Sequence, residues 1–424
     1  MSGTVDTTLA GLEKMGRRAR EAARLLAVTP TETKNAALRA MARALRAGAP
    51  HILAQNRLDL DDGRQAGLTN ALLDRLALND ERVEGMAAGL EEIAEFRDPV
   101  GEVLEMWNGE KGIRIGKIRV PLGVVGIIYE ARPNVTADSA GLCLKSGNAV
   151  ILRGGREALR SNEAIAGLLS EAAAGAGAPA DAVQLLATTD HESSIALMRL
   201  PYLDVLIPRG GKKLKDSVAE NARVPYIMTG EGNCHTFVDA SADVGMAVDI
   251  AVNAKCQRPA VCNAMETLLV HRDIAPRFLP VGLAALAERG VELRCDEESR
   301  RLVSLPSVKA ASEEDWGTEF YDLILAVKVV GGLDEAIEHI TRYGSGHSEA
   351  IVTDSYANAQ AFLARVDAAA VYVNASTRFT DGGVFGFGAE IGISTQKLHA
   401  RGPMGVEQLT SVKFIIYGEG QVRG

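Results

Sequence analysis

The sequence has few cysteines, no excess of positive charge and no long apolar run, and each absence excludes a class of protein. Five cysteines occur in 424 residues, without the paired spacing of a disulfide framework or a zinc site. The 55 acidic residues outnumber the 46 basic ones, giving a formal net charge of −9, which argues against a nucleic-acid partner. The densest basic cluster, Lys212-Lys213-Leu214-Lys215, is typical of a solvated helix face. We therefore expect a cytoplasmic protein without a metal site.

No segment of the sequence is suited to a membrane. No run approaches the roughly 20 consecutive apolar residues that a spanning helix needs. The first 26 residues carry charges throughout, among them Glu13, Arg17 and Glu21, so we do not expect a signal peptide. Hydrophobic residues at 47% and charged residues at 24% are typical of a soluble globular protein. The length predicts two large domains.

The pattern of the chain changes near residue 100. Residues 8–97 have apolar positions at three- and four-residue spacing, which predicts helices and almost no strand. Residues 103–107 and 112–120 alternate apolar and polar side chains across Asn108-Gly109, which predicts a two-stranded hairpin outside the domain. After Pro121, short apolar strands alternate with helical stretches, which predicts a parallel, doubly wound sheet. These strands are expected at 124–128, 149–152, 183–186 and 204–207.

A second series of strands predicts a second α/β domain, at 267–270, 323–327, 350–352 and 371–373. A last strand, 412–417, follows a long irregular segment, 377–403. We expect this strand and the early hairpin to lie outside both cores, because each would leave unpaired edges and an apolar face in a monomer. The two elements therefore predict a homo-oligomer, in which the hairpin of one subunit packs near the late strand of another.

Cys262 is the residue most suggestive of chemistry. It lies in a polar loop interrupted by Pro259, and the loop runs directly into an apolar strand. Lys255, Arg258 and the loop amides are expected to favour the thiolate, which is the nucleophilic form of cysteine. The alternative is a buried, inert cysteine, since such cysteines are common.

Two glycine-containing segments are candidate phosphate sites. Gly210 and Gly211 follow the fourth predicted strand and open a helix whose N-terminus suits a pyrophosphate. Arg153 and Arg156 flank Gly154-Gly155 at the end of another strand, and guanidinium groups suit a phosphate monoester such as the 2′-phosphate of NADP. An ordinary turn and ordinary surface arginines are the alternatives, because no G-x-G-x-x-G follows the first strand.

The chain resembles the aldehyde dehydrogenase superfamily, and within it the branch that reduces L-glutamate 5-phosphate. The resemblance covers residues 8–420 and rests on three stretches: Pro121-Leu122-Gly123-Val124-Val125-Gly126-Ile127-Ile128-Tyr129-Glu130-Ala131-Arg132-Pro133-Asn134-Val135-Thr136, then Gln257-Arg258-Pro259 through Cys262-Asn263-Ala264-Met265-Glu266-Thr267, and residues 336–351. The second and third stretches are specific to this branch. The resemblance implies two doubly wound α/β domains plus a small β oligomerisation element.

The resemblance also implies domain boundaries, a reaction and partners. Residues 1–101 and 122–228 would form a discontinuous NADP-binding domain, 102–121 and 404–424 the oligomerisation hairpin and strand, and 229–403 the catalytic domain. The implied reaction is NADPH-dependent reduction of L-glutamate 5-phosphate to L-glutamate 5-semialdehyde and phosphate, the second step of proline synthesis from glutamate. The implied assembly is a homodimer or homotetramer, and the upstream glutamate kinase is a further implied partner.

Site residues follow from the resemblance position by position. Cys262 matches the nucleophile, and Glu319 the glutamate that holds the nicotinamide ribose. Arg153 matches the lysine at the adenosine ribose, while Arg156 stands where NAD-preferring relatives often carry an acid, which favours NADP. Asn134 or Arg132 falls near the oxyanion asparagine. The preferred interpretation is Asn134 as oxyanion donor, with Arg132 on the phosphate or the substrate α-carboxylate.

Thr229 departs from the pattern of the oxidising relatives, which carry a water-activating glutamate there. This departure suits a reductase, because hydrolysis of a thioester would waste the intermediate. Glu231, two residues away, leaves open the alternative of a semialdehyde dehydrogenase that oxidises its aldehyde to the acid. A non-catalytic scaffold protein on the same fold is the second alternative.

The substrate's amino and carboxylate groups are assigned to the irregular segment after the last core strand. Ser376, Thr377 and Arg378 supply hydroxyls and a positive charge there, and Asp381 supplies a negative one. Such a loop suits a zwitterion, although solvated loop charge explains the composition equally well.

Overall fold

The computed structural model describes residues 9–423, so the first eight residues of the predicted cofactor domain lie outside the described part. The chain forms two compact units, each of which is described by itself. The first unit runs through Met228 and includes Gly386–Gly392 and the chain from Met404 onward; the second is Thr229–Phe385 with Ile393–Pro403.

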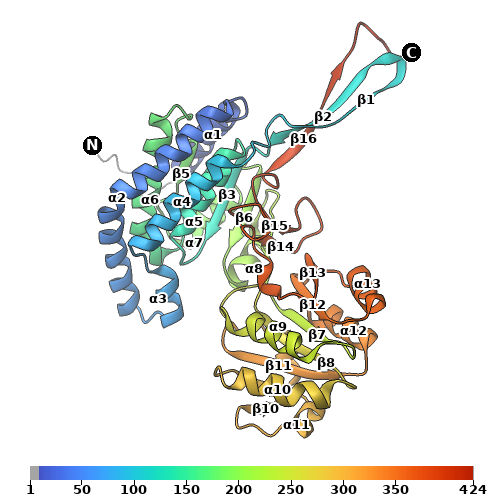
Figure 1. The fold of residues 1–424 in the computed structure, drawn as a ribbon. Helices are drawn as coiled ribbons and strands as arrows, with labels where there is room; N and C mark the ends of the chain where they lie inside the picture. Colours follow the sequence, from blue (N-terminus) through green and yellow to red (C-terminus); the bar gives the residue numbers. More distant parts are fainter. Residues whose placement is uncertain (1–8, 424) are drawn as a thin grey trace. The chain divides into compact units, whose positions relative to one another are not determined.

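The first unit begins with helices, as the apolar spacing predicts (Figure 1). They are α1 (Leu9–Leu26), α2 (Thr31–Gln65), α3 (Asn70–Leu76) and α4 (Asp80–Glu95). Leu38, Met41, Ala42 and Leu45 are fully buried on α2, as expected for one face of an amphipathic helix. The side chains of Thr69 and Asn79 accept N–H groups at the starts of α3 and α4, so polar caps fix where these helices begin.

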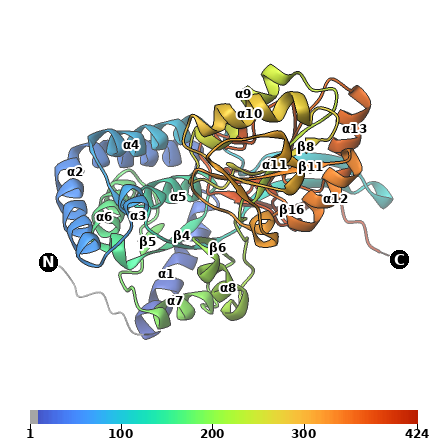
Figure 2. The same ribbon diagram turned by 90° about the horizontal axis from the view of Figure 1, so that it is seen from below.

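A parallel sheet forms the centre of the first unit. Its order is β5-β4-β3-β6, with β3 (Val124–Tyr129), β4 (Ala149–Gly154), β5 (Val183–Leu185) and β6 (Val205–Arg209). The connecting helices are α5 (Asn134–Lys145), α6 (Leu159–Gly175), α7 (His191–Met198) and α8 (Lys212–Asn221), with a short 3-10 turn, η2 (Arg156–Ala158). In Figure 2 the strands lie between α1 and α7 on one side and α2, α4 and α5 on the other. Every residue of β3 is buried, because helices cover both faces of the sheet.

A three-stranded antiparallel sheet extends from the helical body of the same unit (Figure 1). Its order is β1-β2-β16, with β1 (Val103–Asn108), β2 (Arg114–Pro121) and β16 (Thr410–Tyr417). The predicted hairpin is confirmed, although the chain reverses through a 3-10 turn, η1 (Glu110–Gly112), rather than a two-residue turn. The late strand pairs along β2 of its own chain, from Thr410↔Pro121 to Tyr417↔Arg114. The expectation that hairpin and strand each leave unpaired edges is therefore wrong for the edges along which β2 and β16 pair, whereas the outer edges of β1 and β16 have no partner strand within the described residues.

The second unit contains a seven-stranded parallel sheet in the order β10-β9-β11-β8-β7-β12-β13. The strands are β7 (Cys234–Val238), β8 (Met265–His271), β9 (Glu292–Cys295), β10 (Val308–Ala310), β11 (Ile324–Val330), β12 (Ser348–Val352) and β13 (Ala370–Val373). The helices are α9 (Val244–Cys256), α10 (Ala275–Ala287), α11 (Glu297–Leu302), α12 (Leu333–Tyr343) and α13 (Tyr356–Arg365), with a 3-10 turn, η3 (Glu313–Gly317).

Two apolar cores cover the two faces of this sheet. One includes Ile250 of α9 and Phe278 of α10; the other includes Ile337 of α12 and Phe362 of α13. The remaining segment is irregular, as expected, with only η4 (Thr377–Phe379), β14 (Ile393–Ser394) and β15 (Gly402–Pro403). The predicted fold class, with two helix-covered parallel sheets and a small separate β element, is confirmed.

Candidate active site

Cys262 lies in the turn between α9 and β8 of the second unit, and it is partly exposed. Gly232 approaches the backbone of this turn closely. A Cβ atom on Gly232 would lie 1.4 Å from the Cys262 carbonyl oxygen, so no side chain fits at position 232. The Cys262 turn therefore packs directly on the segment that enters β7, and this contact fixes the backbone that carries the thiol.

The other cysteines differ from Cys262 in exposure. Cys143, Cys234 and Cys295 are buried, and burial raises the pKa of each thiol. Cys256 is partly exposed at the end of α9, and burial raises its pKa too, against the opposing charge of Arg289. The Cys234 thiol lies directly behind the catalytic candidate and donates to the Cys262 carbonyl oxygen at 3.2 Å.

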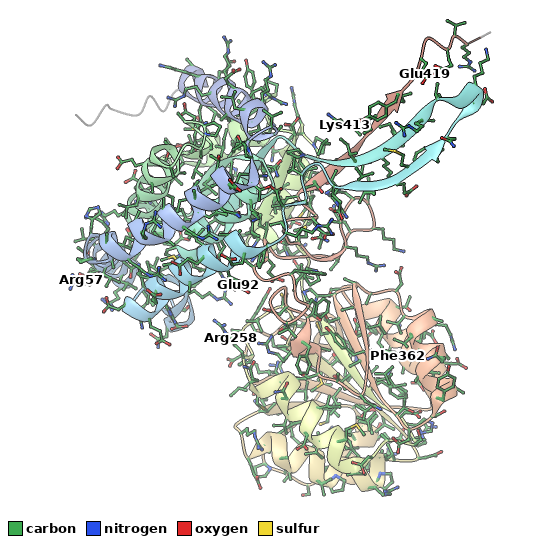
Figure 3. All side chains as sticks on the ribbon, turned by 45° about the horizontal axis from the view of Figure 1, so that its top comes forward. Arg57, Glu92, Arg258, Phe362, Lys413 and Glu419 are labelled. Carbon is green, nitrogen blue, oxygen red and sulfur yellow. The ribbon has the colours of Figure 1, made fainter. Side chains whose placement is uncertain are left out.

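Lys255 does not serve the Cys262 thiol, contrary to the expectation from the sequence. Its side chain is fully buried, and Nζ lies 2.5 Å from Glu266 Oε2, so its charge is neutralised inside the unit. The cations of the site are instead Arg258, which is exposed (Figure 3), and Arg378. Arg378 bonds Gln257 and Asn263, which lie in the same loop as Cys262, and its charge interacts with those of Arg258 and Cys262.

The predicted substrate loop packs on the Cys262 turn. Thr377 Oγ1 donates to the Asn263 carbonyl at 2.7 Å, and Asn263 Nδ2 donates to the Thr380 carbonyl at 2.9 Å. Arg378 binds both Gln257 Oε1, at 2.9 Å, and Asn263 Oδ1. The structure therefore brings two separately predicted sequence features together.

The three residues predicted to bind substrate differ in burial, and therefore in whether their side chains can contact a ligand. Ser376 is buried, and its hydroxyl accepts the Arg378 N–H at 3.2 Å. Thr377 is fully buried with its hydroxyl bonded to the catalytic turn. Arg378 is partly exposed, so it is the one whose side chain has room for a ligand. The hydroxyls of Ser376 and Thr377 stabilise the loop through hydrogen bonds within the chain. The Arg378 guanidinium is the candidate for binding an anionic group of the substrate.

Glu319 lies beside the same turn. Its Oε1 accepts the Gly232 N–H at 3.0 Å, and its carboxylate is hydrogen-bonded to Tyr321. Burial, followed by the charges of Glu319, Cys262 and Glu231, raises the pKa of Tyr321. Cys262, Gly232, Glu319 and Tyr321 thus form one cluster, which the sequence predicted only through Cys262 and Glu319.

Thr229, the residue in place of a water-activating glutamate, is buried and forms an isolated antiparallel bridge with Ser394. It is fixed in the backbone framework of the second unit. Glu231 is exposed, and its negative charge is one of the causes that raise the pKa of Tyr321. At the position where the resemblance places a water-activating glutamate, this chain therefore has a neutral, buried hydroxyl side chain.

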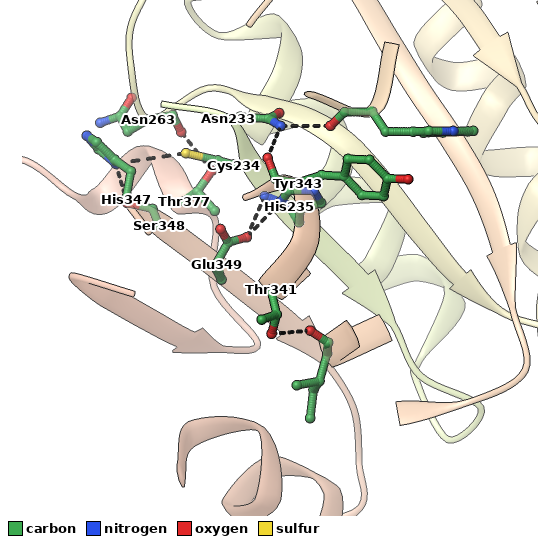
Figure 4. Close-up of polar contacts among 12 residues, drawn as sticks. Asn233, Cys234, His235, Asn263, Thr341, Tyr343, His347, Ser348, Glu349 and Thr377 are labelled. Atoms are coloured by element: carbon green, nitrogen blue, oxygen red, sulfur yellow. Dashed lines mark hydrogen bonds and ion pairs between the residues drawn. The ribbon is translucent and has the colours of Figure 1, made fainter. Parts of the chain in front are cut away.

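A buried polar network lies behind the thiol and was missed from the sequence (Figure 4). Cys234 Sγ lies 3.9 Å from His347 Nδ1, and His347, Ser348 and Thr380 follow in a hydrogen-bonded chain with 2.8 and 2.7 Å links. Beside it, His235 binds Glu349 at 3.0 Å with both side chains fully buried. The available signal was the branch-specific stretch 336–351, which contains three of these residues.

In the first unit, Asn134 and Arg132 lie at the start of α5. Asn134 is exposed, and its Nδ2 donates to Asp138 Oδ2 at 3.0 Å; desolvation raises the pKa of Asp138 to about 6. The preceding Ala131 has a left-handed φ of 40°, and its N–H donates to Glu157 Oε1 at 2.5 Å. This strained turn, held by a carboxylate, sets the direction in which the chain enters α5.

Arg153 and Arg156 lie at the C-terminal end of β4, and they differ in exposure. Arg153 is partly buried, donates to the Thr189 carbonyl at 2.9 Å, and has a lowered pKa because of burial. Its buried Nε has no hydrogen-bond partner within the described residues. Arg156 is exposed. An orphaned guanidinium donor and an exposed cation at one strand end fit the 2′-phosphate of NADP.

Gly210 and Gly211 precede α8, and a side chain of the chain itself occupies this helix start. Glu130 Oε2 accepts the Gly211 N–H at 2.9 Å, and a Cβ atom on Gly210 would lie 2.5 Å from the same oxygen. The backbone donor thus binds an anion, as expected for a pyrophosphate site. A cofactor phosphate would have to displace Glu130 from this position.

The described residues contain neither a candidate metal site nor a helix that could span a membrane. Residues 9–423 contain no group of three or more His, Cys, Asp and Glu side chains suited to a metal ion. Across the same residues, no helix has the length and apolar character needed to cross a bilayer.

Comparisons with known proteins identify the family to which the chain belongs. The sequence model of the aldehyde dehydrogenase family matches residues 4–315. The gamma-glutamyl phosphate reductase of Moorella thermoacetica is 62% identical over 97% of this chain and 98% of its own length. The crystal structure of gamma-glutamyl phosphate reductase from Thermotoga maritima matches with a TM-score of 0.94 and 50% identity, covering 97% of this chain and 100% of that one.

A more distant structure shares the fold alone. The acetylating aldehyde dehydrogenase from Geobacillus thermoglucosidasius has a TM-score of 0.73 at 19% identity, with 98% of each chain covered. The resemblance drawn from the sequence is confirmed by these matches, and the chain belongs to the aldehyde dehydrogenase family, alongside close relatives named gamma-glutamyl phosphate reductase.

Proposed function

We propose that this protein reduces L-glutamate 5-phosphate with NADPH to L-glutamate 5-semialdehyde and phosphate, the second step of proline synthesis from glutamate. The observation that carries the proposal is the Cys262 turn, with a partly exposed thiol, Gly232 packed on its backbone and Arg378 beside it. The names of the relatives at 55–62% identity support the same reaction.

The first step in this proposal forms a thioester. The Cys262 thiolate attacks the acyl carbon of the mixed anhydride; the carbon–sulfur bond forms as the bond to the phosphate oxygen breaks, and phosphate leaves with the electron pair. Arg378 binds an anionic group of the substrate, and Arg132 the phosphate or the α-carboxylate. A neutral Thr229 leaves no base at that position to activate water, which protects the thioester.

The second step releases the aldehyde. When bound, the reduced nicotinamide nucleotide supplies the hydride for the thioester carbon. The amide of Asn134 and the backbone N–H of Cys262 donate to the oxyanion that develops on the substrate. Collapse of this tetrahedral species re-forms the carbonyl group, breaks the carbon–sulfur bond and returns the Cys262 thiolate.

Cofactor-binding roles are proposed residue by residue. Arg153 and Arg156 bind the 2′-phosphate, Gly210 and Gly211 the pyrophosphate, and Glu319 the nicotinamide ribose. Residues 1–101 and 122–228 would then be the cofactor domain and 229–403 the catalytic domain.

The location and the partners belong to the same proposal. Five free cysteines and the proposed pathway favour the cytoplasm. Oligomerisation through 102–121 and 404–424, and contact with the glutamate kinase, belong to the same proposal.

The experiment that tests the reaction is an aldehyde-oxidation assay in the reverse direction, with NADP+ and L-glutamate 5-semialdehyde. Phosphate must attack the thioester in reverse, so we expect oxidation only when phosphate is present. Oxidation at the same rate without phosphate would show that water cleaves the thioester, and the protein would then be a semialdehyde dehydrogenase. Glu231→Gln is the matched variant, because loss of a phosphate-independent rate in it would identify the hydrolytic base.

A further inference from the structure

The short segment Glu319-Phe320-Tyr321, between η3 and β11, carries the proposed ribose ligand in an unusual backbone conformation. Tyr321 has a φ of 56°, a left-handed value that is costly for an aromatic residue. Such a conformation persists only where surrounding groups hold it. Glu319, two residues earlier, therefore depends on whatever fixes the backbone at Tyr321.

A buried ion pair contacts this segment. Lys255 Nζ and Glu266 Oε2 are 2.5 Å apart, and both side chains are fully buried. The other carboxylate oxygen of Glu266, Oε1, accepts the Tyr321 N–H at 3.4 Å. Two cations lie near the Phe320 ring, with Lys255 Nζ 6.0 Å and the Arg294 guanidinium 5.0 Å from its centroid.

Stability does not account for the pair on its own. Removing two charges from water offsets most of their mutual attraction, and well-packed apolar side chains commonly stabilise such a position equally well. Burial raises the pKa of Glu266 to about 7 and lowers the pKa of Lys255, which agrees with an environment that penalises charge. What the pair adds beyond two apolar side chains is an acceptor for the Tyr321 N–H and a cation at the Phe320 ring.

We propose that Lys255 and Glu266 are positioning residues for cofactor binding: Glu266 holds the backbone of Tyr321, and this contact places Glu319. The inference rests on the proposed role of Glu319 at the nicotinamide ribose. It gives a function to Glu266, which has no part in the roles proposed for Cys262 and for the substrate loop. It also gives a role to Lys255, which precedes the Cys262 loop in sequence and whose ammonium group is paired with Glu266.

Two double variants separate the backbone contact from the buried charges. Lys255→Met/Glu266→Gln removes both charges but keeps an acceptor for the Tyr321 N–H. Lys255→Met/Glu266→Leu removes the charges and the acceptor. We expect the Gln variant to keep its KM for NADPH within about twofold and the Leu variant to raise it about tenfold, which is the scale of one lost hydrogen bond. Alkylation of Cys262 by iodoacetamide should proceed at the wild-type rate in both.

Three outcomes decide the matter. Equal KM values in the two double variants at equal melting temperature would overturn the inference, because the acceptor would then have no role. Hydrogen exchange of the Tyr321 amide in the wild-type protein gives a test that needs no variant, and fast exchange there would also overturn it. Glu319→Gln tests the proposed function separately: an unchanged KM for NADPH in that variant refutes the ribose role, whereas the exchange measurement still decides whether Glu266 holds Tyr321.

Discussion

At the scale of single residues, the thiol gives the most direct prediction. Cys262→Ser should abolish semialdehyde formation, because a serine hydroxyl is a far weaker nucleophile at neutral pH, while NADPH binding measured by fluorescence titration should persist. Cys256→Ser is the matched control, since Cys256 is the other partly exposed thiol, and it should keep most of the activity. If the Cys256 variant is inactive and the Cys262 variant is not, the nucleophile is assigned wrongly.

The cofactor arginines differ in a way that selects which to substitute. Arg153 bonds the backbone at Thr189, so its loss would disturb the fold, whereas Arg156 is exposed. Losing a charge-assisted contact costs about 1.5–3 kcal/mol, or roughly ten- to a hundredfold in affinity. Arg156→Glu should therefore weaken NADPH by that factor in a binding titration and leave NADH unchanged.

A matched charge reversal controls for long-range electrostatics. Arg57 on α2 is also exposed (Figure 3), so Arg57→Glu changes the net charge equally and should leave both cofactors unaffected. Equal loss of NADPH and NADH binding in Arg156→Glu would show that this arginine supports the fold rather than the 2′-phosphate.

Glu130 leads to a prediction in the opposite direction. Its carboxylate accepts the Gly211 N–H at the helix start proposed for the pyrophosphate, so it competes with an incoming anion and repels it. Glu130→Gln should tighten NADPH binding by about two- to tenfold, with a smaller dependence on salt. Weaker binding in this variant would mean that Glu130 organises the site rather than blocking it.

The surroundings of a site residue were predictable where local sequence determines them. Cys262 was expected in a polar turn before a strand, and it lies in such a turn between α9 and β8; its role as nucleophile stays a prediction. Lys255 was assigned wrongly because its partner, Glu266, lies in the following strand, and only the fold brings the two together. The hydroxyls of Ser376 and Thr377 were predicted to bind substrate, yet both bond the chain itself, since a sequence does not show which polar groups are buried.

At the scale of elements, strands were predictable where their residues are apolar or alternate between apolar and polar, as in β1, β2 and β16, and a strand with neither pattern was not. β8, β11 and β12 were expected from Val, Leu and Ile. β7, Cys-His-Thr-Phe-Val, was missed because its polar residues are buried through tertiary hydrogen bonds such as that of His235 with Glu349. The pairing of β16 with β2 spans almost the whole chain, and no local pattern encodes a partner at that distance.

The close approach of the β7 entrance to the catalytic turn predicts the effect of one methyl group. Gly232→Ala would place Cβ 1.4 Å from the Cys262 carbonyl oxygen, so the turn must move. A displacement of about 1 Å can cost about a hundredfold in rate, and we expect kcat to fall by at least that factor in a steady-state assay. Gly317→Ala is the control, because nothing lies within 4 Å of its added Cβ; similar losses in both variants would contradict the steric argument.

At the scale of the whole molecule, the β1-β2-β16 sheet predicts self-association. Trp107 packs edge-on against Phe414, with centroids 6.1 Å apart, yet both side chains remain exposed, as does Ile416 at 59%. Alternation along β16 puts Val412, Phe414 and Ile416 on one face. An apolar face together with the outer edges of β1 and β16 is a surface that proteins normally cover. Because β16 pairs with β2 of its own chain on one side, a second subunit must use this face or one of those two outer edges.

The intact protein should therefore sediment as a dimer or a dimer of dimers at micromolar concentration. Phe414→Asp/Ile416→Asp should shift it to monomer in sedimentation velocity, because two charges would be buried in the apolar interface. Lys413→Glu changes an exposed residue of the same strand on the opposite face (Figure 3) and should leave the assembly intact. A monomeric wild-type protein, or an aspartate variant that still assembles, would show that this sheet is not the association surface.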